Sequence, residues 1–145
     1  KGGAAADVII GGTLSDTLTG GAGNDTFHLV GHANNFIYDT ITDATNGDIL
    51  LAANAGTETS LGKLTLSAAA GFSDYLDVAA AGAGNTNGVW ANFVYGGNTY
   101  ITLDLSAGAS FVAGTDLVIE LAGVKDLAGT TFAGANSITL DVDGA

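Results

Sequence analysis

The chain has 145 residues and a formal net charge of −12, with 15 acidic residues against three lysines and no arginine. This balance argues against a nucleic-acid partner, because phosphate contacts need clustered Lys and Arg, and against docking on anionic lipid. The absence of cysteine excludes disulfides and thiolate metal sites, and no apolar run is long enough to make this a transmembrane protein.

The first 28 residues repeat with a period of nine. Residues 2–10 read GGAAADVII, residues 11–19 read GGTLSDTLT and residues 20–28 read GGAGNDTFH. Each copy begins with two glycines and has an aspartate at its sixth position and a large apolar residue at its eighth. A fixed period of this kind indicates a stacked architecture. The alternative, a flexible Gly/Ala linker with scattered aspartates, gives no reason for an apolar residue in every copy.

The order of residues within each copy predicts a turn followed by a short strand. Glycine tolerates positive φ and lets backbone carbonyls converge, so the turn can present carbonyl oxygens and one carboxylate to a hard cation. The three residues after the aspartate then form a strand whose central residue points inward. These inward residues are predicted to be Ile9, Leu18 and Phe27.

The pattern resembles the RTX family, whose nonapeptide G-G-x-G-x-D-x-U-x coils into a calcium-binding parallel β-roll. The resemblance implies that two repeats complete one coil and that each Ca²⁺ ion lies between turns two repeats apart. One site should lie between Gly2–Asp7 and Gly20–Asp25, and Asp16 should pair with a turn outside the first and third repeats. In the first two repeats Ala5 and Leu14 replace the third glycine. The calcium ligands implied in the three turns are Gly2, Ala4, Asp7, Gly11, Thr13, Asp16, Gly20, Ala22, Gly23 and Asp25.

The segment LVGHANNFIYDTITDATNGDILLA, residues 29–52, follows the repeats. Its aspartates Asp39, Asp43 and Asp48 are separated by short apolar pairs, and Asn46-Gly47 is a turn signal. RTX chains close their roll with a segment of this kind, so the resemblance implies that Asp39 and Asp43 complete the last coil around a further ion. Taken singly, each aspartate fits a solvent-facing turn carboxylate equally well.

The remaining residues predict a β-rich region with one short helix. Ser73 is the expected N-cap, Tyr75–Ala81 the helix and Gly82 its stop, with a loop over 82–88. Alternating apolar residues predict a hairpin over 89–105 and strands over 117–121 and 137–142. The expected fold is therefore all-β, with a short parallel β-roll and its closing strands over 1–52 and an irregular β-rich cap over 53–145.

The second half resembles the C-terminal region of RTX-type, Caulobacter-like S-layer proteins. The resemblance lies in SDYLDVAAAGAG, in VYGGNTYITLDLSAGASFVAGTDLVIELAGV and in the ending near SITL, and it covers roughly residues 2–140. It implies a secreted subunit on the bacterial cell surface that self-associates into a calcium-dependent lattice or filament. It also implies export by a type I secretion apparatus through a C-terminal signal, and we expect the chain to be the C-terminal piece of a longer protein. The alternative is a generic RTX tail that serves the export and folding of an adhesin or hydrolase.

Enzymatic activity is not expected from these motifs. His28 and His32 lack the H-E-x-x-H setting, no G-x-S-x-G elbow is present, and carboxylate pairs occur only in the calcium-turn candidates. The stretch Asp104–Asp116 stays open between a calcium-binding loop and an ordinary hairpin connection. Ser106 and Gly108 stand there in place of the middle ligands of the D-x-N-x-D loops found in related tails.

Overall fold

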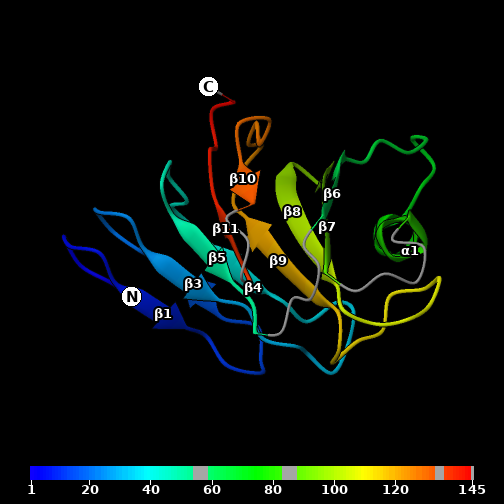
Figure 1. Ribbon diagram of the computed structural model, residues 1–145, viewed down its shortest axis with the longest axis horizontal. Helices are drawn as coiled ribbons and strands as arrows, with labels where there is room; N and C mark the ends of the chain where they lie inside the picture. Colours follow the sequence, from blue (N-terminus) through cyan, green and yellow to red (C-terminus); the bar gives the residue numbers. More distant parts are fainter. Residues whose placement is uncertain (54–58, 83–87, 133–135, 145) are drawn as a thin grey trace.

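The computed structural model describes residues 1–53, 59–82, 88–132 and 136–144. In these residues eleven strands form two sheets, and a single helix, α1, packs on strands β7 and β8 of the second sheet (Figure 1). No helix in the described part has the length and hydrophobicity that a membrane crossing needs. The predicted fold class, mostly β with parallel strands and one short helix, is confirmed.

The N-terminal strands form a parallel β-roll. Strands β1, β3 and β5 are parallel neighbours in the first sheet, and β2 and β4 are parallel neighbours in the second. Consecutive strands therefore enter opposite sheets, as a coil of two repeats requires. The bounds are β1 (Val8–Ile10), β2 (Thr17–Leu18), β3 (Thr26–His28), β4 (Asp39–Ile41) and β5 (Ile49–Leu51).

The central residue of each roll strand points into the space between the two sheets. Ile9 lies beside Phe27, and Phe27 beside Leu50, in the register of the first sheet. In contrast, the residues flanking Ile9 in β1 are exposed, Val8 by 68% and Ile10 by 61%. The predicted inward position of the eighth residue is therefore confirmed, and the buried set is Ile9, Leu18, Phe27, Ile41 and Leu50.

The C-terminal strands extend both sheets. The first sheet has the order β1-β3-β5-β11-β10, and the second has the order β2-β4-β9-β8-β7-β6. The predicted hairpin is confirmed as an antiparallel pair of β7 and β8, whereas the strand predicted over 137–142 spans only Ser137–Thr139. Sequence patterns did not predict β6 or β10. The bounds are β6 (Thr59–Lys63), β7 (Val89–Tyr95), β8 (Asn98–Asp104), β9 (Leu117–Leu121), β10 (Thr131–Phe132) and β11 (Ser137–Thr139).

Helix α1 spans Phe72–Gly82, so the prediction that Ser73 is its N-cap was wrong. The Asp74 carboxylate accepts a hydrogen bond from Gly71 N at 2.7 Å, and this side chain satisfies an amide just before the helix. Gly82 is the last helical residue, in agreement with the predicted stop. Of the loop predicted over 82–88, residues 83–87 lie outside the described residues.

Both sheets cross the boundary that the sequence predicts between residues 52 and 53. Strand β5 pairs with β11 in the first sheet, and β4 pairs with β9 in the second. The division of the chain into 1–52 and 53–145 stays a prediction. The pairings show that the roll and the C-terminal strands contact each other through backbone hydrogen bonds.

Candidate metal centre

The turns that precede the roll strands form two stacks, at opposite edges of the roll (Figure 1). The first turn stack consists of Gly2–Asp7, Gly20–Asp25 and Asp43–Asp48, which lead into β1, β3 and β5. The second turn stack consists of Gly11–Asp16 and Asn34–Asp39, which lead into β2 and β4. Each turn therefore lies beside the turn two repeats away.

Aspartate side chains connect the turns of the first stack. Asp7 N donates to Asp25 Oδ1 at 2.8 Å, and Asp25 N donates to Asp48 Oδ1 at 2.9 Å. Asp43 contacts the beginning of the neighbouring turn instead of its end. Its two carboxylate oxygens accept hydrogen bonds from Gly20 N at 2.9 Å and from Gly21 N at 2.8 Å. The carboxylates thus lie between successive turns, where a shared cation would be bound.

The second stack repeats this contact. Asp16 N donates to Asp39 Oδ1 at 3.0 Å, and Asp39 is 2% exposed. Burial raises the pKa of Asp39, and the hydrogen bond from Asp16 and the nearby imidazole of His32 lower it in part. His32 Nε2 lies 3.4 Å from Asp39 Oδ1, so this carboxylate has a side chain beside it that becomes cationic on protonation.

The paired glycines have no side chain, and oxygen atoms of neighbouring turns occupy the space that a side chain would fill. A Cβ at Gly2 would lie 2.3 Å from Gly20 O, and one at Gly11 would lie 2.4 Å from Asp39 Oδ2. At Gly21 the backbone φ is +103°, and a Cβ would lie 2.0 Å from Gly3 O. Any larger residue would push apart the carbonyls and carboxylates of neighbouring turns. An all-oxygen donor set of this kind fits Ca²⁺, which takes 6–8 oxygen ligands.

Apart from His32 beside Asp39, basic side chains do not balance the charge of the described turns. In the described part of the chain, no Lys or His lies at ion-pair distance from Asp7, Asp16, Asp25, Asp43 or Asp48. Asp25 and Asp48 are each 1% exposed. A buried carboxylate without an ion-pair partner favours a bound cation, because a lone negative charge is unfavourable in a low dielectric.

The predicted ligands lie in the stacked turns, and their roles as calcium ligands stay predictions. The turn with Gly2, Ala4 and Asp7 stacks on the turn with Gly20, Ala22, Gly23 and Asp25. In the turn with Gly11, Thr13 and Asp16, Gly11 and Asp16 lie against Asp39. Asp39 and Asp43 belong to the last coil, Asp39 in the second stack and Asp43 in the first. Their roles as individual calcium ligands stay predictions.

Sequence reasoning left Asp48 out of the ligand set. Asp48 Oδ1 accepts the amide of Asp25, and its Oδ2 accepts Thr45 N at 2.8 Å. In the register of the first sheet it takes the place that Asp25 has in the previous coil. The sequence does contain the repeat signal for Asp48, because Asp48 follows Asp39 by nine residues and precedes the inward Leu50 by two.

Two further features lie outside the turn stacks. Asp104 and Asp116 are buried where β8 ends and β9 begins. Burial, and to a smaller extent the charge of Asp116, raise the pKa of Asp104 to about 6.

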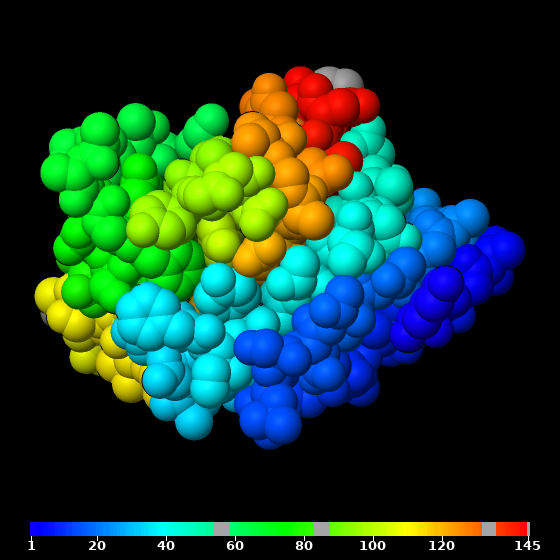
Figure 2. Space-filling model, turned by 180° about the vertical axis from the view of Figure 1, so that it is seen from behind, coloured from blue at the N-terminus to red at the C-terminus, as the bar shows by residue number. Residues whose placement is uncertain are grey.

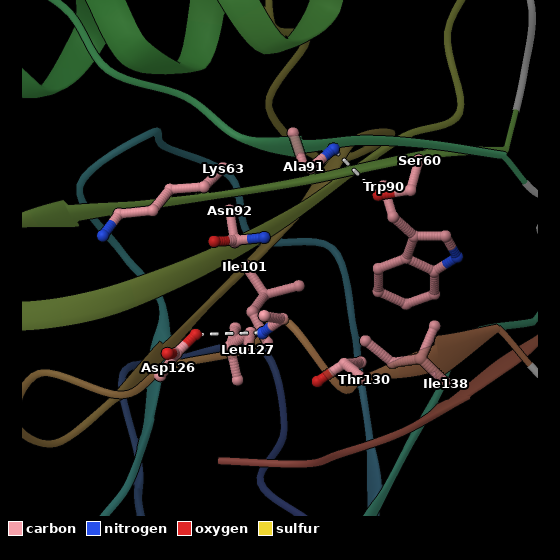
Figure 3. A pocket seen from close by; sticks show the side chains of 12 residues that line it. Ser60, Lys63, Trp90, Ala91, Asn92, Ile101, Asp126, Leu127, Thr130 and Ile138 are labelled. Carbon is pink, nitrogen blue, oxygen red and sulfur yellow. Dashed lines mark hydrogen bonds between the residues drawn. The ribbon is translucent and has the colours of Figure 1, made fainter. Parts of the chain in front are cut away.

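A pocket of about 300 Å³ lies beside β6 and β7, with Lys63 and Asp126 on one side and the Trp90 indole on the other (Figure 3). Asp126 is the one carboxylate among its described lining residues, so the pocket lacks the paired carboxylates of the turn stacks.

Comparison with known proteins identifies the repeats. Residues 1–29 match a family model that is described as the RTX calcium-binding nonapeptide repeat (four copies). A comparison with curated proteins gave no match. The N-terminal repeats are therefore RTX repeats, and the ion that they bind is calcium. The structure continues the stacking beyond residue 29, through the turn that ends at Asp48.

Proposed function

We propose that this chain is a calcium-dependent structural subunit of a bacterial surface layer, without enzymatic activity. The observation that carries the proposal is the stacking of acidic turns in which the buried carboxylates of Asp25 and Asp48 contact the next turn and have no ion-pair partner among the described basic residues. Proteins with RTX repeats are typically secreted, and this supports an extracellular location. The C-terminal residues would then provide assembly surface and the signal for type I secretion.

Calcium would act as the internal staple of the fold. The chain has no cysteine, and its acidic turns repel one another until cations neutralise them. An ion that binds only the folded state stabilises it by about 1.4 kcal/mol at ten times its Kd. Extracellular modules bind calcium at about 10⁻⁴–10⁻³ M, so their sites stay empty in the cytosol. The chain would stay unfolded during export and fold outside the cell.

Exposed apolar side chains support self-association. In strand β1 the side chains of Val8 and Ile10 are exposed, on the face of the first sheet opposite the buried Ile9. The N-terminal repeats that carry them lie at one side of the molecule (Figure 2). Neighbouring exposed apolar side chains are typical of a protein contact surface, so this face of β1 is where we expect subunits to contact each other.

Chelation tests the proposal in two steps. Far-UV circular dichroism should lose its strand signal when EGTA is added and regain it with millimolar calcium but not with equal magnesium. Electron microscopy of the refolded chain should then show sheets or filaments that EGTA dissolves. A strand signal that chelator leaves unchanged would contradict the calcium role. A folded monomer at high calcium would instead support the export and folding tail of an adhesin or hydrolase.

A further inference from the structure

Two buried carboxylates face each other where strand β8 ends and β9 begins. Leu103 pairs with Leu117 in the antiparallel register, so Asp104 and Asp116 form the next facing pair. Asp104 is 3% exposed and Asp116 is 2% exposed. This pair lies in the second sheet, outside both turn stacks and far along the chain from residues 1–29, which match the repeat model.

The surroundings of Asp116 show that it is a carboxylate held in place. Its Oδ1 accepts hydrogen bonds from Leu105 N and Ser106 N, both at 2.8 Å. Its Oδ2 accepts Val112 N at 2.7 Å and Ser106 Oγ at 3.0 Å. These donors fold the connection between β8 and β9 around a fixed negative charge.

Asp104 is different, because one of its oxygens has no donor. Its Oδ1 accepts Ser106 N at 3.2 Å and lies 3.4 Å from Ser106 Oγ. Its Oδ2 is buried and has no hydrogen-bond partner in the described part of the chain. Neither Asp104 nor Asp116 forms an ion pair with a described basic residue. A charged, buried carboxylate oxygen without a partner, next to a second carboxylate, is unfavourable, and a proton or a bound cation would relieve it.

We propose that Asp104 and Asp116, together with the hydroxyl of Ser106, bind a calcium ion at a site separate from the RTX repeats. Asp104 would provide the oxygen that has no donor, and Ser106 can rotate its O–H away so that its oxygen and Asp116 Oδ2 are also available. Calcium suits the site because all three side-chain donors are hard oxygens. With few protein ligands, binding in the weak range of extracellular modules is expected. The site would join β8 to β9 and does not depend on a surface-layer role.

Counting bound ions in the full chain tests this site. Equilibrium dialysis with radioactive calcium should find one ion fewer per chain for Asp104→Asn than for the wild type. The control is Asp126→Asn, which removes an exposed carboxylate in the same half of the chain and should bind as many ions as the wild type. Circular dichroism in calcium establishes that each variant is folded. A folded Asp104→Asn chain with an unchanged ion count would overturn the proposal.

A second variant covers the case in which Asp104→Asn does not fold. Ser106→Ala removes the hydroxyl and leaves both carboxylates, so the weakest step of the calcium titration should move to several-fold higher calcium. An unchanged titration curve would overturn the site. Combining Asp104→Asn with Asp25→Asn separates this site from the repeats, because the two sites do not share residues and their ion losses should add.

Discussion

Replacing Asp25 with asparagine tests the calcium role of the first turn stack. Asp25 is 1% exposed, its Oδ1 accepts the amide of Asp7, and its own amide donates to Asp48 Oδ1. Its turn therefore lies between the other two turns of the stack. Asparagine keeps the size of the side chain and one carbonyl oxygen, so the substitution removes mainly the charge.

The expected loss follows from two terms. A hydrogen bond to a charged acceptor contributes about 1 kcal/mol more than one to a neutral acceptor. Each calcium ion lost removes about 1.4 kcal/mol at ten times its Kd. Asp25→Asn should therefore lower the free energy of unfolding by about 2.5 kcal/mol if one ion is lost and by about 4 kcal/mol if both neighbouring interfaces lose theirs. At roughly 3 °C per kcal/mol for a chain of this size, Tm should fall by roughly 8 to 12 °C.

Urea unfolding followed by circular dichroism in millimolar calcium measures this loss. Asp126→Asn is the matched control, because it removes an exposed carboxylate outside both stacks, and surface changes of this kind stay within about 0.5 kcal/mol. The loss for Asp25→Asn should also shrink as calcium is lowered toward its Kd. Equal losses in the two variants, or a loss independent of calcium concentration, would refute the reasoning.

Two further substitutions, one of them with a control, test the packing of the turns and the extent of the stack. Gly21→Ala should cost at least about 2 kcal/mol, because its Cβ would collide with Gly3 O, whereas Gly62→Ala should cost only about 1 kcal/mol. Gly62 also has a positive φ, +69°, but nothing lies within 4 Å of the position that a Cβ would take there, so similar losses in urea would argue against close packing of the turns. Asp48→Asn should lower the free energy of unfolding in calcium by about 2 kcal/mol, because Asp48 accepts amides from Asp25 and Thr45. An effect within the range of surface substitutions would show that the calcium stack ends before this turn.

The roll could be predicted because its signals are local and repeated. Each of the first three copies carries its own glycines, aspartate and inward residue, and the structure uses them in that order. The two later copies, residues 34–42 and 43–51, were missed as repeats for a physical reason. Residues 29–33 interrupt the period, and Asn34 and Asp43 replace the first glycine. These copies keep the aspartate and the inward apolar residue, and both are buried in the roll.

The C-terminal half shows what sequence patterns could not supply. The hairpin of β7 and β8 was predicted from its alternation of apolar residues around Gly96-Gly97. Strand β6 has no such alternation, since its side chains are mostly exposed and its register shifts between Ser60 and Gly62. Its position is set by pairing with β7, a partner distant in sequence. The facing of Asp104 and Asp116 likewise depends on the register of β8 and β9.

The free energy of calcium binding should reach the whole fold, because the two stacks are attached to strands that belong to both halves. Strands of two or three residues are too short to hold their register alone, so the turns must fix it. Leu50 in β5 and Ile41 in β4 are fully buried in the same core cluster as Leu121 and Ile138 of the C-terminal strands. If the turns separate without calcium, β11 and β9 each lose a neighbouring strand and the shared core opens to water. Metal at one end of the molecule therefore stabilises apolar packing at the other.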